Sequence, residues 1–324
     1  MNPAFSVIFL TTLIGVGQGM FIALFSGQYY ALLQHVPPQP GSFYGAGSMV
    51  ALAFLVGGLI ASFFHLGHPE RAWRAATQWR TSWLSREVIV LPAFMAIVFV
   101  YGVLHFFGIN PGVFGTAAIP EFGLTMVVGA VGVVVCFALF ACTAMIYACL
   151  KFLQEWHSPL TVANYTLLGM ASGFTLATVF ANLQNSPLLG FYGDWSVILT
   201  VVAFLSRGTS LIRNYRLKHK STLQTAIGVR HANIQQKSQG AMGGSFNTRE
   251  FFHGKTATFI KSIKWIFLVM VFLIPIILVL VGFYGNHHEL FIIAFATQYL
   301  GLIAERWFFF AQARHPQNLY YQTV

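Results

Sequence analysis

Two ionisable side chains, His65 and Glu87, stand at either end of a charge-dense stretch of the sequence. An imidazole titrates close to neutral pH without any perturbation, and partial removal from water brings a glutamate toward neutrality. We expect His65 to end one membrane helix and Glu87 to start the next, which places both groups at the same depth. At that depth each group can exchange a proton.

The segment between them, residues 66–86, is predicted to lie in the membrane interface. Pro69 prevents simple continuation of the preceding helix. Tryptophans favour the headgroup level, and arginines reach from there toward water or phosphate. The residues expected to support the two ionisable groups are Arg71, Trp73, Arg74, Trp83, Ser85 and Arg86, with Trp79 and Arg80 in the same stretch.

The composition indicates whether the chain lies in water or in a membrane. Hydrophobic residues make up 56% of the 324-residue chain and charged residues 8%, and mean hydropathy is +0.68. Soluble domains carry roughly 25% charged residues. Apolar runs near or above the ~20 residues that a helix needs to cross a bilayer predict an all-α integral membrane protein. We expect eight transmembrane helices in two packed helical bundles, at Phe5 to Leu33, Phe43 to His65, Glu87 to Phe107, Phe122 to Leu150, Pro159 to Leu183, Trp195 to Arg213, Phe259 to Tyr284 and Leu290 to Phe310.

Charge then orients these spans. The loops after the first, third, fifth and seventh span contain no Lys or Arg but hold Glu121, Asp194 and Glu289, whereas the basic residues fall on the other face. By the positive-inside rule, this predicts a multi-pass protein of the inner membrane with both termini in the cytoplasm. The partners expected at the basic face are lipid and protein; nucleic acid is not expected.

A long hydrophilic connector, residues 214–258, follows the sixth span. From Arg216 to Lys255 it holds seven Lys or Arg against one acid, Glu250. One interpretation is a solvated loop held near anionic lipid, and the other is a docking arm for an acidic soluble partner. An internal loop of this length in a compact protein is usually functional or disordered.

Three further charged residues stand in the later spans. Arg207 is intramembrane if its helix begins at Trp195, and near the cytoplasmic end if the helix begins closer to Leu188, which we favour. Glu305 and Arg306 are adjacent, and we expect them in an interfacial ion-pair network.

Other notable residues have structural interpretations. We expect no removable signal at the N-terminus, and Pro275 is expected to kink the seventh helix. His105, His157, His287 and His288 are expected in surface or interface roles at helix ends. Small residues are expected to pack in the core, namely Cys136, Cys142 and Cys149 and the glycines Gly15, Gly17, Gly19, Gly57, Gly58, Gly129 and Gly132.

Four motifs resemble those of a known family. His65-Leu66-Gly67, Arg71 to Ala75 and Ser82 to Glu87, with Gly301 to Ala311 near the end, are similar to the membrane anchor subunits of the dimethyl sulfoxide reductase family (DmsC type), which includes sulfite dehydrogenase anchors (SoeC type). The resemblance covers residues 1–324 as a single membrane-anchor domain.

The resemblance implies a chain without its own iron-sulfur cluster or metal site. Such a chain holds a quinone, ubiquinone or menaquinone, beside an iron-sulfur electron-transfer subunit, which connects it to a molybdopterin catalytic subunit. The family's quinol-site His and Glu correspond to His65 and Glu87. Quinone and quinol interconvert with two electrons and two protons, which suits two groups able to titrate near neutral pH.

Other interpretations remain open. A lone His at a helix end is ordinarily structural, and Glu87 could pair with Arg86 at a helix start. A haem b anchor would need two axial His on facing helices, whereas the His residues cluster at span ends, so haem b is neither indicated nor excluded. A transporter would show broken helices near the midplane, and no clear pair is present. The basic face carries the quinone motif, which favours a cytoplasmic sulfite dehydrogenase anchor over the quinol-oxidising anchor of an exported dimethyl sulfoxide reductase.

Overall fold

The computed structural model describes residues 1–116, 119–218, 220–235 and 251–321, and it is helical apart from one short hairpin. The helices are α1 (Phe5–Leu32), α2 (Gly41–Phe63), η1 (Pro69–Gln78), α3 (Trp83–Phe106), α4 (Leu124–Ala148), α5 (Pro159–Leu183), α6 (Leu189–Tyr215), α7 (Leu223–Ile227), α9 (Ala257–Leu268), η2 (Val269–Leu273), α10 (Ile274–Tyr284), α11 (Leu290–Ala311) and α12 (Pro316–Tyr321). Strands β1 (Gly112–Thr116) and β2 (Ile119–Gly123) pair antiparallel in the loop after α3, where no strand was expected.

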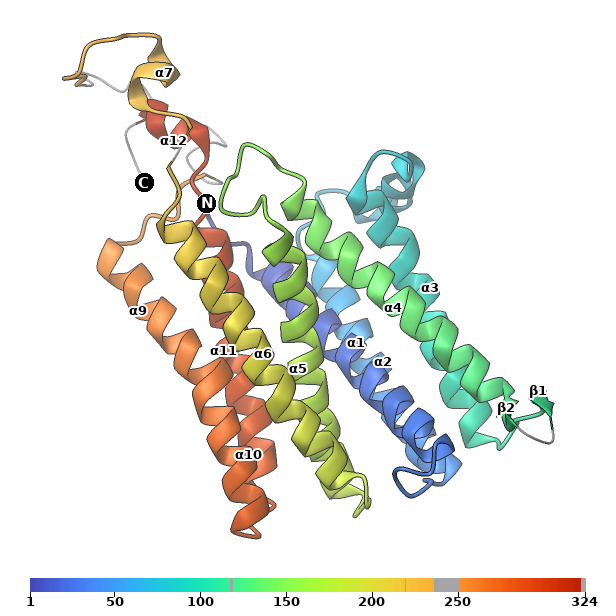
Figure 1. Ribbon diagram of the computed structural model, residues 1–324. Coiled ribbons are helices and arrows are strands. Elements are labelled where there is room, and N and C mark those ends of the chain that lie inside the picture. Colours follow the sequence, from blue (N-terminus) through green and yellow to red (C-terminus); the bar gives the residue numbers. More distant parts are fainter. Residues whose placement is uncertain (117–118, 219, 236–250, 322–324) are drawn as a thin grey trace.

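Seven helical stretches in the described part of the chain are long and apolar enough to cross a membrane. They are α1 to α6 and the continuous stretch from α9 through η2 to α10. The predicted eighth span forms helix α11, which runs beside α9 and α10 (Figure 1) but carries Gln298, Glu305 and Arg306 and is less apolar than the seven. The prediction of an all-helical, multi-pass membrane protein is confirmed, and the count of eight spans stays a prediction.

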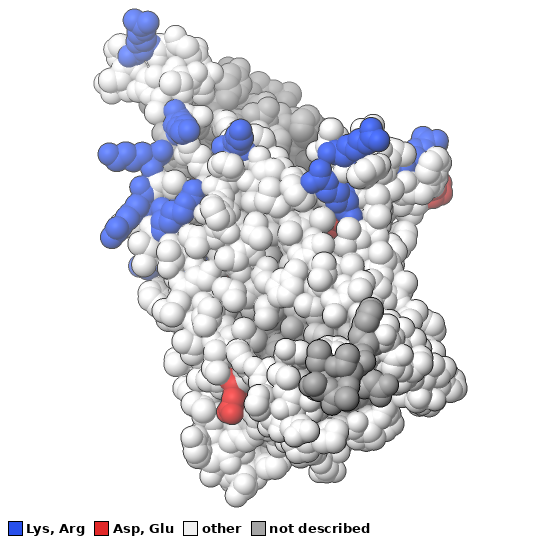
Figure 2. Space-filling view, turned by 45° about the vertical axis from the view of Figure 1, so that its right-hand side comes forward, with Lys and Arg blue, Asp and Glu red and all other residues white. Residues whose placement is uncertain are grey.

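Charge distinguishes the two ends of the helices. Figure 2 shows Lys and Arg gathered toward the upper end, where Figure 1 places both termini and the turn that follows α4. We call this the basic end. Asp194 and Glu289 lie in the sequence beside the turns at the other end.

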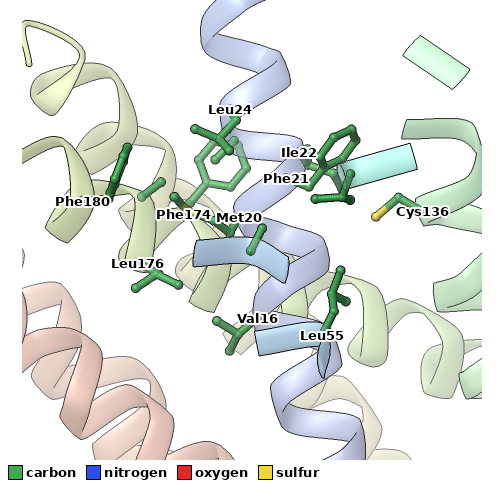
Figure 3. Close-up of a cluster of buried hydrophobic side chains, with 14 of the residues drawn as sticks. Val16, Met20, Phe21, Ile22, Leu24, Leu55, Cys136, Phe174, Leu176 and Phe180 are labelled. Atoms are coloured by element: carbon green, nitrogen blue, oxygen red, sulfur yellow. The ribbon is translucent and has the colours of Figure 1, made fainter. Parts of the chain in front are cut away.

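Glycines of α1 and α5 allow these two helices to pack unusually closely. A Cβ placed on Gly19 would overlap the backbone of Gly169 and Gly173, and a Cβ on Gly173 would overlap the backbone of Gly19. Small residues are what permit such close approach between membrane helices. The packing role predicted for Gly19 is confirmed. Around this seam lies a buried cluster that includes Met20, Phe21, Leu24, Phe174 and Phe180 (Figure 3).

Two smaller expectations need correction or refinement. Cys136 and Cys142 are buried, but Cys149 is exposed, because it lies at the C-cap of α4 rather than within the helix. The residues before Pro275 form the π-helical turn η2, which accommodates a proline whose ring would clash with the preceding helical turn.

The glycine seam generates the first prediction. Gly173→Ala should destabilise the protein by about 1–3 kcal/mol, the usual cost of overpacking, because the added methyl group meets the backbone of Gly19. The measurement is thermal unfolding of the purified protein in detergent. Gly208→Ala on α6 is the control, since nothing lies within 4 Å of a Cβ there. Equal unfolding temperatures for the two variants would contradict the seam.

Candidate functional site

The chain between α2 and α3 forms an exposed turn at the basic end. Pro69 starts the 3-10 helix η1, none of whose residues is buried. Three arginines stack on tryptophans here, with Arg Cζ to ring-centroid distances of 5.6 Å for Arg74 and Trp73, 5.4 Å for Arg80 and Trp79, and 4.2 Å for Arg86 and Trp83. The segment therefore presents paired aromatic and cationic surfaces of the kind found at the headgroup level.

Helix α3 begins at Trp83, and side chains near its start form hydrogen bonds with backbone groups there. Ser82 is the N-cap, and its hydroxyl accepts from the Ser85 N–H at 3.3 Å. Arg86 donates through Nε to the Trp79 carbonyl at 2.9 Å and through Nη2 to the Arg80 carbonyl at 2.8 Å. Arg86 therefore secures the preceding turn and points away from the bundle.

Glu87 is buried, with 6% of its surface exposed, although it lies in the first turns of α3. Its Oε1 accepts a 2.5 Å hydrogen bond from the Thr143 hydroxyl on α4. Burial of an ionisable side chain in a membrane helix is costly and marks a candidate functional position.

His65 lies beyond the end of α2 and is exposed, unlike Glu87. Partial burial still lowers the pKa of His65, which favours the neutral imidazole with one donor and one acceptor nitrogen near neutral pH. Within the described residues, no hydrogen bond or ion pair joins His65 to Glu87. The structure thus places both at the basic end, one at the membrane edge and one inside.

A second set of ionisable residues lies between α6 and α11. Glu305 Oε1 is 2.7 Å from Arg207 Nε, and Glu305 Oε2 is 3.2 Å from Arg306 Nη1. Helix α6 begins at Leu189, which agrees with the expected earlier start, so Arg207 lies in its basic half. The ion-pair network expected for Glu305 and Arg306 is present. It lies inside the protein, since Arg207 is 1% and Glu305 0% exposed.

Sequence reasoning missed the aromatic residues beside this set. Arg306 Cζ lies 3.7 Å from the ring centroid of Tyr165 on α5. Tyr165 in turn stacks with Tyr147 on α4, with ring centroids 5.8 Å apart. Thr143 and Tyr147 are four residues apart and share one face of α4. The presence of Thr143 and Tyr147 on one face of an otherwise apolar helix was the sequence feature that could have indicated this cluster.

An apolar groove of about 560 Å³ lies elsewhere, between α2 and α3 near the other end, and includes Gly45, Gly102 and Phe106 in its lining. Neither His65 nor Glu87 lines it. His105 is half-buried near the same end, with ring centroids 4.7 Å from Tyr44 and 4.5 Å from Tyr101. The candidate site rests on buried polar chemistry at the basic end rather than on cavity size.

Long apolar helices with ionisable residues buried toward one basic end define a multi-pass membrane protein. The chain belongs to the DMSO reductase anchor subunit (DmsC) family, which it matches over residues 1–312. It is 58% identical over 324 residues, covering the whole of both chains, to a sulfite dehydrogenase subunit of Allochromatium vinosum. The family resemblance found in the motifs is confirmed, and the protein is a membrane anchor subunit of an oxidoreductase.

The hydrogen bond to Glu87 generates the second prediction. Thr143→Val should destabilise the protein by about 1–3 kcal/mol, because it leaves a buried carboxylate oxygen without its donor. Thr143→Ser keeps the hydroxyl and should retain most of the stability. Thermal unfolding in detergent compares them. A Val variant as stable as the Ser variant would show that this bond contributes nothing.

Proposed function

We propose that this anchor binds a quinone at its basic end and passes electrons between an iron-sulfur subunit and the quinone pool, with sulfite oxidation as their source. The observation that carries the proposal is Glu87, a carboxylate held inside the bundle at the start of a span, close in sequence to the exposed His65. Family membership and the sulfite dehydrogenase relative support the same assignment.

The residues at this end fit a quinone headgroup. A bound quinone takes up two electrons and two protons, so its ring oxygens need groups that hydrogen-bond and exchange protons. His65 offers a donor and an acceptor nitrogen, and Glu87 offers a carboxyl group that can take up and release a proton. Trp73, Trp83 and the arginines stacked on them give this end an amphipathic surface.

We further propose eight spans, with α11 as the last, and both termini in the cytoplasm. This layout follows from the basic end and the positive-inside rule. It places the quinone site on the face where an iron-sulfur subunit, itself connected to a molybdopterin subunit, would dock. The described part of connector 214–258 is basic and adds electrostatic attraction for an acidic partner; its residues 219 and 236–250 lie outside the described residues.

The quinone site generates the third prediction. His65→Ala and Glu87→Gln should each lower quinone-linked turnover by ~10²-fold or more, because each removes a proton-transfer partner. Turnover is measured on the purified complex with sulfite as donor and decylubiquinone as acceptor. His68→Ala and Glu70→Gln are matched controls, since their side chains are 68% and 63% exposed in the neighbouring turn. Wild-type turnover in both site variants would refute the quinone assignment.

Orientation generates the fourth prediction and separates the two family layouts. A reporter fused after Val324 should be active only in its cytoplasmic form, because the C-terminus lies at the basic end. A dimethyl sulfoxide reductase of the exported type would carry its catalytic subunit on the other side. Activity confined to a periplasmic reporter would therefore reverse the orientation and remove the preference for sulfite.

A further inference from the structure

Four formal charges are buried among the described helical residues, those of Glu87, Arg207, Glu305 and Arg306. All four lie in the basic half of the bundle. Glu305 contacts both guanidinium groups and compensates one of them. The set as a whole is neutral only when Glu87 is also ionised, and uncompensated charge in a membrane protein interior is strongly unfavourable.

An aromatic bridge connects the arginine end of this set to Glu87. Arg306 stacks on Tyr165, with 3.7 Å between Cζ and the ring centroid. Tyr165 stacks on Tyr147, with centroids 5.8 Å apart, and Tyr147 is one helical turn from Thr143, which donates to Glu87. Tyr147 and Tyr165 each lie within electrostatic range of both Glu87 and Arg306.

We propose that Arg306 is a positioning residue whose positive charge favours the ionised form of Glu87 across the Tyr147–Tyr165 pair, against the effect of burial, and so sets the pH range in which the quinone site exchanges protons. This inference rests on the proposed function. During quinone reduction two electrons arrive from the iron-sulfur subunit and two protons reach the ring oxygens. Glu87 takes one of these protons from water at the basic end, passes it to a ring oxygen and returns to the carboxylate, and His65 passes the other proton.

The balance of charge around Glu87 determines the direction of each effect. A proton on Glu87 leaves this set of four charges with one net positive charge, which favours onward transfer of the proton. The titratable, charged or hydrogen-bonding groups beside Glu87 are Arg86 on α3 and Cys142, Thr143 and Tyr147 on α4. Its network continues through Tyr165 on α5 to Arg207 on α6 and to Glu305 and Arg306 on α11. Arg86 is turned toward the interfacial segment by its own hydrogen bonds.

Two variants that remove charges of opposite sign test the proposal. In the intact complex, with sulfite and decylubiquinone, the midpoint of the alkaline limb of the pH–rate profile should rise by on the order of one pH unit in Arg306→Gln, because a positive charge is lost. In Glu305→Gln it should fall, because a negative charge is lost. Arg306→Lys keeps the charge and should restore the wild-type midpoint. Lys151→Gln removes an exposed cation from the basic end, where water and salt screen it, and should leave the midpoint unchanged.

If Arg306 and Glu305 had only structural roles, replacing either would lower turnover but would not shift the two midpoints in opposite directions. Midpoints that stay fixed, or that move the same way in Arg306→Gln and Glu305→Gln, overturn the proposal. An infrared pH titration of the Glu87 carboxyl band, assigned by its loss in Glu87→Gln, gives the same comparison without turnover and covers a variant too inactive to assay. Wild-type turnover in Glu87→Gln would instead refute the quinone function, while the infrared shifts would still test the electrostatic connection.

Discussion

A charge inside a membrane protein must be neutralised by another group of the same protein, and this constraint shapes the basic half of the bundle. Glu305 and Arg306 pair with each other on α11, whereas Arg207 on α6 pairs with Glu305, so the charge that α6 buries is neutralised by another helix. Removing one partner of a buried pair typically costs ~3–5 kcal/mol. The network therefore fixes how α6 and α11 face each other, and it directs Arg306 toward Tyr165 on α5.

The close contact between the glycines of α1 and α5 also affects where the neighbouring helices lie. Because Gly19 and Gly173 leave no room for side chains, α1 and α5 pack backbone against backbone. Helix α4 packs against both α1 and α5, which brings Tyr147 onto Tyr165. The absence of side chains at Gly19 and Gly173 thus helps to place Tyr147 of α4 against Tyr165 of α5.

The two candidate proton-exchange groups differ in surroundings as well as in type. His65 lies at the exposed edge of an interfacial segment rich in Trp–Arg stacks, and Glu87 lies inside, bound to Thr143. Under the proposed function, the first meets ligand and water at the membrane edge, and the second connects that edge to the buried charges. They lie at the ends of consecutive helices, and the short helix η1 lies between them in the chain.

Sequence alone determined the features that depend on composition and local pattern: the membrane class, the helix positions, the family, the asymmetry of charge, and His65 and Glu87 as candidates. The length of apolar runs and the positions of Lys and Arg are properties of the linear sequence, so they can be evaluated without knowing the fold. Only the tertiary structure decided that Arg207, Glu305 and Arg306 are buried together, that Arg86 bonds to the interfacial segment, and that Thr143, Tyr147 and Tyr165 lie between Glu87 and these charges. These are contacts between helices far apart in sequence, and they depend on which face of each helix the glycines and side-chain packing turn inward.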